Sequence, residues 1–168
     1  KLININPDMA IFGKALGNGY AITAILGKQS IMDSAKKSFI SSTFWTERIG
    51  PAAAIKTLEI MEREKSWKKI TYLGKKLFSI WKKLSRKYNL AIDISGLPSI
   101  AKFNFKSKDA QVYKTFITQE MLDYKFLAAN LVYLSISHNE KILKKYSEHL
   151  DEIFYTISEC EKGNLDIS

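Results

Sequence analysis

The sequence is poor in the residues that build cross-links and metal cages. Among its 168 residues it has one cysteine, Cys160, and two histidines, His138 and His149. A single cysteine excludes an internal disulfide, and this set is too small for a zinc cage of cysteines and histidines. Cys160 falls on a helical pattern near the C-terminus, which favours a packing role over chemistry.

Long apolar runs are absent as well. No apolar stretch approaches the ~20 residues that span a bilayer, and residues 1–20 lack a basic segment followed by an apolar one with a cleavage site. We therefore expect a soluble, cytoplasmic chain with no membrane partner. Its 46% hydrophobic and 12% aromatic residues suffice for the core of one full domain or two small lobes.

Acidic residues are outnumbered, since 17 Asp and Glu stand against 26 Lys and Arg, a formal charge of +9. Lysine pairs recur at 68–69, 75–76 and 82–83, a seven-residue spacing that returns each pair to one side of a helix. The opposite side carries an apolar stripe of Trp67, Ile70, Leu73 or Gly74, Leu77, Trp81, Leu84 and Tyr88. The pattern indicates the solvated face of an amphipathic helix. Nucleic-acid binding by the 68–83 lysines is the alternative hypothesis, and we regard a nucleic-acid partner as disfavoured.

The apolar patterning predicts two lobes. In the first, buried strands are expected over 9–12 and 20–26, then a short helix over 30–37 and a longer one from Gly50-Pro51 that breaks near Ser66 before the amphipathic helix. In the second, strands are expected over 90–94, 99–105 and 131–136, with helices that begin at Asp109 and after Ser137 or Asn139. The expected fold is an α/β segment followed by a small α+β lobe.

One lysine stands out in the stretch PDMAIFGKALGNGYAITAILG, residues 7–27. Lys14 lies between apolar runs, with Gly13 before it and Gly17 shortly after it. An amine that forms an imine must spend time neutral, which apolar walls favour, and glycines bring backbone N–H groups close to a phosphate. A solvated lysine at a strand end is the other interpretation. A P-loop is excluded because no glycine stands five residues before Gly13.

A second stretch, FISSTFWTERIGPAAA, covers residues 39–54. It gathers Ser41, Ser42, Thr43 and Thr46 just before an expected helix start, where hydroxyls and free N–H groups bind anions. The structural alternative is a capped turn with aromatic packing.

Five segments resemble, in order and spacing, the class III (fold type I) pyridoxal-phosphate aminotransferases, especially the glutamate-1-semialdehyde aminomutase-like branch. They are PDMAIFGKALGNGYAITAILG, STFWTERIGPAAA, SGLPSIAKFNF, QEML and YLSISHNE. The resemblance covers essentially the whole chain. It implies that 1–65 is the C-terminal part of the cofactor-binding large domain, 66–88 a connecting helix, and 89–168 a small α+β C-terminal domain.

By this resemblance, Lys14 binds pyridoxal 5'-phosphate as a Schiff base and acts as the acid/base in amino-group transfer from a small-molecule amino donor to a carbonyl acceptor. Thr43 matches the position whose hydroxyl and N–H bind the cofactor phosphate, commonly across the interface of a homodimer, with Ser42 as a neighbouring ligand. Arg48 is a candidate partner for a substrate carboxylate. The alternative for Arg48 is an ion pair with Glu47 or with a helix neighbour.

Departures from the family pattern leave alternatives open. Residues 46–48 stand where many relatives have glycine-asparagine-proline, which favours transfer between molecules over an aminomutase. Family members are more than twice as long, and the N-terminal fragment would hold the groups that contact the pyridine ring. The alternative is therefore a catalytically inactive remnant. His138 either lines the substrate side, or caps or packs the last helix.

Overall fold

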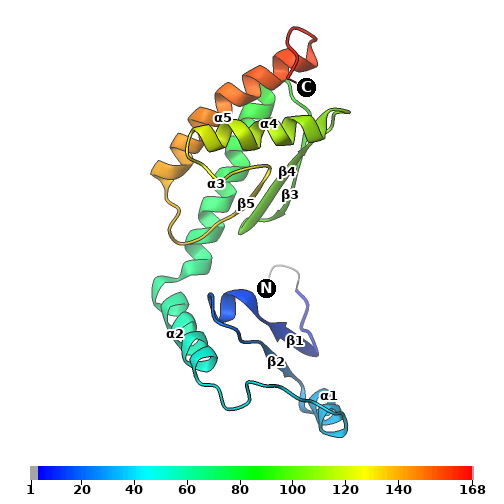
Figure 1. Cartoon of the computed structure of the whole chain (residues 1–168), viewed down its shortest axis with the longest axis vertical. Coiled ribbons are helices and arrows are strands. Elements are labelled where there is room, and N and C mark those ends of the chain that lie inside the picture. Colours follow the sequence, from blue (N-terminus) through cyan, green and yellow to red (C-terminus); the bar gives the residue numbers. More distant parts are fainter. Residues whose placement is uncertain (1–3, 168) are drawn as a thin grey trace. The chain divides into compact units, whose positions relative to one another are not determined.

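The computed structural model describes residues 4–167, and the chain divides into two compact units, the first ending at Lys65 and the second beginning at Ser66. The elements are labelled in Figure 1. The first unit contains β1 (Met9–Phe12), the 3-10 helix η1 (Lys14–Leu16), β2 (Ala24–Gly27), α1 (Gln29–Met32), the 3-10 helix η2 (Asp33–Lys37) and α2 (Ile49–Glu64). The second contains α3 (Ser66–Lys87), β3 (Ile92–Leu97), β4 (Ile100–Phe105), α4 (Ala110–Asp123), β5 (Leu131–Tyr133) and α5 (Glu140–Glu161).

The first unit is built around a pair of short strands. β1 and β2 are antiparallel, with Ile11 opposite Ile25. The strand predicted over 20–26 begins later, at Ala24, because the chain before it forms a turn. The expectation that both strands are buried is wrong for the described residues, since Ile11 and Ile25 are 68% and 51% exposed. A ribbon of two strands has no neighbouring strands or second layer of its own, so its apolar side chains stay open unless another element covers them.

The break predicted near Ser66 is confirmed. α2 ends at Glu64, and Lys65 takes a left-handed conformation with φ 49° before α3 begins. The stripe predicted on α3 is buried at Leu73, Gly74, Leu77, Trp81 and Leu84. Across residues 4–167, no helix combines the length and the hydropathy needed to cross a membrane.

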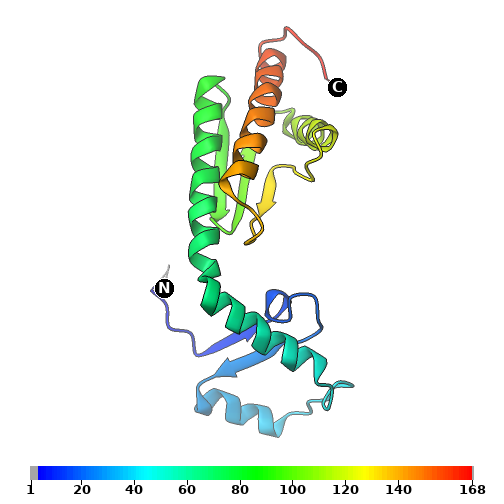
Figure 2. The same ribbon diagram turned by 90° about the vertical axis from the view of Figure 1, so that its left-hand side faces the viewer.

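The second unit is a sheet covered by helices on one face. Its strands are antiparallel in the order β3-β4-β5. Along β4, Ala101, Phe103 and Phe105 are buried while Ile100 and Lys102 are exposed, the alternation typical of a sheet with one solvated face. Figures 1 and 2 show α3 and α5 side by side along this sheet. The strands predicted over 90–94, 99–105 and 131–136 exist with shifted bounds.

Aromatic side chains form the centre of the second unit's core. The rings of Trp81 and Phe103 lie 4.8 Å apart, and those of Phe103 and Phe154 lie 5.8 Å apart. All three side chains are fully buried. The indole N–H of Trp81 donates to the hydroxyl of Tyr146 at 3.0 Å. One aromatic cluster thus joins α3, β4 and α5.

Asn139, one of the two caps predicted for the last helix, begins α5. Its side-chain oxygen accepts a hydrogen bond from Ile142 N at 3.0 Å. Asn139→Ala is therefore expected to lower the free energy of unfolding by about 1 kcal/mol, measured by urea denaturation of the chain. Ser137→Ala is the matched control, because Ser137 does not cap the helix, and it is expected to leave the stability unchanged. Equal losses in the two variants would contradict the assignment.

Candidate functional site

Lys14 lies directly after β1, at the start of η1. Its φ angle is 48°, in the left-handed region that residues other than glycine rarely adopt. Lys65, Asn89 and Lys125 share this conformation, but they follow α2, α3 and α4, where it commonly ends a helix. Asn4 and Asn18 also share it, and asparagine adopts it more readily than lysine does. Lys14 instead turns the chain at a strand end and is exposed. Residues held this way cluster at active sites and ligand clamps, since the structure around them must enforce the conformation.

The turn after Lys14 is closed by its own backbone. The N–H groups of Asn18 and Tyr20 donate to the carbonyls of Lys14 and Gly17, both at 3.2 Å. A Cβ added at Gly17 would lie 2.1 Å from the Tyr20 carbonyl oxygen, so this position accepts only glycine. The two amides hold the turn instead of facing a phosphate. The turn therefore presents an exposed amine on a tight backbone.

The hydroxyl-rich stretch forms the loop before α2. Ser42 Oγ accepts a hydrogen bond from Phe44 N at 3.1 Å, which makes a local turn. The carboxylate of Glu47 accepts from the N–H of Ile49 and, at 2.9 Å, from the N–H of Gly50. These two N–H groups at the start of α2 are thus already paired with an acidic side chain of the same chain.

Thr43 and Arg48 lie in the same loop and are both exposed. Within residues 4–167, Arg48 makes no ion pair. The predicted alternative, a salt bridge from Arg48 to Glu47, is therefore wrong, because Glu47 caps α2. The guanidinium of Arg48 remains open to an external carboxylate.

The start of α2 packs against the chain that follows the Lys14 turn. A Cβ added at Gly50 would lie 2.8 Å from the carbonyl oxygen of Ala21, so the two backbones meet closely. A hollow of about 1080 Å³ in the first unit is lined by Ala21, Ser42 and a mixture of apolar, hydroxyl and acidic side chains, but by neither Lys14 nor Thr43. The structure therefore brings Ser42 to this hollow and leaves the other two residues outside it.

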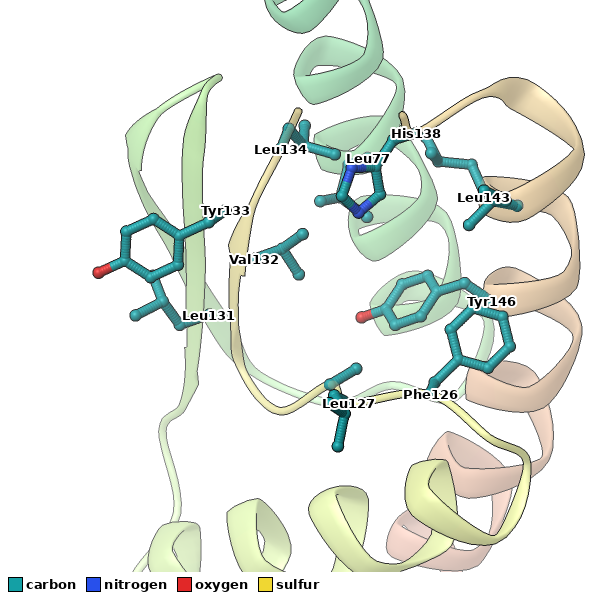
Figure 3. Close-up of a pocket in the computed structure, with 12 residues that line it drawn as sticks. Leu77, Phe126, Leu127, Leu131, Val132, Tyr133, Leu134, His138, Leu143 and Tyr146 are labelled. Atoms are coloured by element: carbon teal, nitrogen blue, oxygen red, sulfur yellow. The ribbon is translucent and has the colours of Figure 1, made fainter. Parts of the chain in front are cut away.

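One pocket of the second unit has a volume of about 310 Å³ and is shown in Figure 3. Its walls come from α3, the segment between α4 and β5, β5 itself, the segment between β5 and α5, and the start of α5. The lining residues are Leu77, Phe126, Leu127, Ala128, Leu131, Val132, Tyr133, Leu134, His138, Ile142, Leu143 and Tyr146. Of these, the sequence singled out only His138 as a candidate, whereas Tyr146 falls at the spacing of a core residue on the last helix. Nothing in the spacing of the others signals a pocket.

Comparisons with known proteins place the chain in a family. A family model described as aminotransferase class-III matches residues 1–148. The chain is 33% identical over 168 residues to the 3-aminobutyryl-CoA aminotransferase of Cloacimonas acidaminovorans, an alignment that covers 99% of this chain and 39% of that protein. It is 28% identical over 164 residues to the glutamate-1-semialdehyde 2,1-aminomutase of Methanococcus maripaludis, with 88% of this chain and 38% of that protein covered.

The fold agrees with these sequence matches. The structure of the PLP internal aldimine form of FumI from Sphingopyxis sp. MTA144 matches with a TM-score of 0.84 at 23% identity, covering 98% of this chain and 40% of that one. This likeness confirms the expected partial fold of a pyridoxal-phosphate transaminase. The chain spans about two fifths of the length of the curated relatives it matches. The resemblance inferred from the sequence is thereby confirmed, and the chain belongs to the class-III aminotransferase family.

Proposed function

We propose that this chain supplies the lysine-bearing part of a pyridoxal-phosphate-dependent enzyme that transfers amino groups, with Lys14 as the residue that binds the cofactor. The observation that carries the proposal is the placement of Lys14. It is an exposed amine, held in a left-handed conformation at a strand end, in a member of the class-III family. The three left-handed residues Lys65, Asn89 and Lys125 follow helices, and the remaining two non-glycine residues, Asn4 and Asn18, are asparagines, which adopt this conformation more readily.

Lys14 has two tasks in this proposal. Its Nζ would hold the cofactor through the aldehyde carbon, and, after a substrate amine takes that place, the freed amine would move a proton at the substrate carbon that bears the nitrogen. The tight turn closed at Gly17 holds the backbone that carries this side chain. The bound cofactor supplies an electron sink, which stabilises negative charge on that carbon.

The loop before α2 supplies the secondary contacts. We propose that Thr43, with Ser42 beside it, donates to the cofactor phosphate across a homodimer interface, and that Arg48 binds a substrate carboxylate. Two features support this assignment: Thr43 and Arg48 are exposed, and the carboxylate of Arg48's neighbour, Glu47, is committed to α2.

The complete site requires groups that these residues do not provide. We propose that an N-terminal segment contributes the contacts to the pyridine ring, and that the assembled enzyme works in the cytoplasm on a small-molecule amino donor and a carbonyl acceptor. Transfer between molecules is favoured over an aminomutase reaction. The relative at 33% identity supports this choice, because it is named an aminotransferase.

The proposal is tested by mapping where pyridoxal phosphate attaches. The chain is complemented with the N-terminal segment proposed above, incubated with an equimolar amount of pyridoxal phosphate, reduced with borohydride, digested, and analysed by mass spectrometry. The adduct is expected at Lys14, and Lys14→Ala and Lys14→Arg are both expected to lose it, since neither side chain provides a nucleophilic amine.

Lys37→Ala is the matched control, because Lys37 is an exposed lysine in the same unit. It is expected to leave the adduct at Lys14 unchanged. An adduct spread evenly over the lysines, or none at Lys14 in the folded chain, would reject Lys14 as the cofactor lysine and favour the inactive-remnant hypothesis.

A further inference from the structure

The 310 Å³ pocket of the second unit, shown in Figure 3, is apolar and has no charged side chain in its wall. Its side-chain polar atoms belong to Tyr133, His138 and Tyr146. Figure 3 shows the Tyr133 hydroxyl turned away from the pocket, whereas the Tyr146 hydroxyl and the His138 ring face into it. Two side chains therefore present polar groups to the pocket. They are His138, just before α5, and Tyr146, within α5.

Tyr146 presents a buried donor that has no acceptor. The residue is 5% exposed, and its oxygen accepts the indole N–H of Trp81 at 3.0 Å. Because that nitrogen can only donate, the phenolic proton must find another acceptor, and none of the side chains or carbonyls in residues 4–167 accepts it. Burial raises the pKa of the Tyr146 phenol, so the proton stays on the oxygen. A buried hydroxyl of this kind calls for an acceptor from outside the chain.

His138 presents a second donor. Its Nδ1 accepts from the backbone N–H of Ser135 at 3.1 Å and lies 3.0 Å from the Ser135 hydroxyl. A backbone N–H cannot accept, so Nδ1 must be the unprotonated nitrogen, and the neutral ring carries its proton on Nε2. The Ser135 contacts thereby fix both the ring orientation and the tautomer.

We propose that this pocket binds the neutral carbonyl group of a small aliphatic amide, ester or thioester, with the carbonyl oxygen accepting from Tyr146 and the chain packed on the apolar wall. A carbonyl oxygen has two lone pairs, so it can also accept from His138. A carboxylate is disfavoured because no cationic side chain lines the pocket to offset its desolvation. At roughly 30 Å³ for each water-sized group, the volume admits about ten non-hydrogen atoms.

The test is a titration of the 168-residue chain with N-methylhexanamide, followed by the indole N–H resonance of Trp81 in two-dimensional NMR spectra. This resonance is expected to shift on binding, because Trp81 donates to the same oxygen that engages the ligand. Tyr146→Phe is expected to weaken binding about fivefold through the loss of one hydrogen bond between neutral groups. Hexanoate is expected to bind at least about tenfold more weakly than the amide.

Tyr113→Phe is the control, since it removes a buried tyrosine hydroxyl of the same unit that does not line the pocket. It is expected to leave the affinity unchanged. Ala128→Phe, which places a ring in the pocket from its loop, is expected to abolish binding while the spectrum stays folded. Equal affinity in Tyr146→Phe and the parent, preference for hexanoate, or no shift of the Trp81 resonance at millimolar amide would each overturn the proposal.

Discussion

Trp81→Ala is expected to lower the free energy of unfolding of the second unit by about 4 kcal/mol. Trp81 is completely buried and packs on Phe103, with ring centroids 4.8 Å apart. Its removal leaves a cavity that rigid neighbours fill only in part, which adds to the lost burial of apolar surface. It also takes away the donor to Tyr146, so that hydroxyl oxygen is left without its protein partner.

The measurement is urea denaturation of the full chain, followed by far-ultraviolet circular dichroism. Trp67→Ala is the matched comparison, because Trp67 lies on the same helix and is 43% exposed. It is expected to cost about 1 kcal/mol, since less of its surface is withdrawn from water. Similar losses in the two variants would show that Trp81 does not have the central place in the core that its burial indicates.

Gly74→Ala is expected to destabilise the second unit by about 3 kcal/mol, the reverse of the usual effect. In the middle of a helix, alanine is ordinarily favoured over glycine by about 1 kcal/mol. At this position a Cβ would lie 1.9 Å from the Pro98 carbonyl oxygen and 2.4 Å from its carbonyl carbon. Both are backbone atoms in the turn between β3 and β4, so relief of the clash requires α3 to move away from the sheet.

Ser79→Ala provides the control on the exposed face of α3. The Ser79 hydroxyl bonds only to the Lys75 carbonyl of its own helix, at 3.1 Å, and its replacement is expected to change the stability by less than about 0.5 kcal/mol. The two variants are compared by the same urea denaturation. A Gly74→Ala chain as stable as the parent would mean that α3 and the sheet do not meet as closely as this contact requires.

Much of the second unit could be predicted, because the spacing of apolar residues along each helix and strand marks the face that becomes buried. The three- and four-residue steps on α3 mark the face that becomes buried, and the alternation along β4 separates Phe103 from Lys102 in the way the sheet requires. The Asn139 cap follows from its place before an amphipathic run. Register and strand ends were less accessible, since they depend on which residues face each other across the sheet.

In the first unit, predictions were wrong where burial or hydrogen bonding depends on which other segments contact a residue. Apolar runs at Ile11 and Ile25 predict burial, yet burial depends on what covers the strands, and the described residues leave both exposed. The roles of backbone N–H groups were equally hidden. Sequence placed free amides near Gly17 and at the start of α2, whereas hydrogen bonds within the turn and to Glu47 use them.

The candidate sites show the same division. Lys14 could be selected because an isolated lysine between apolar runs and glycines matches a family pattern, while its left-handed backbone required the structure. The pocket shown in Figure 3 could not be predicted, because its polar residue resembles an ordinary core residue in the sequence. Tyr146 has the spacing of a core residue on α5. Only its hydrogen bond from Trp81 shows that the phenolic proton has no acceptor among the described residues.

Cys160 provides a chemical probe of local unfolding at the end of α5. It is the sole cysteine, it packs against the core of the second unit from α5, and its burial raises the pKa of the thiol. A thiol reagent therefore labels a single position, and the raised pKa of the thiol slows the reaction. A labelling rate that increases in a variant whose core stays folded therefore reports local opening at the end of α5.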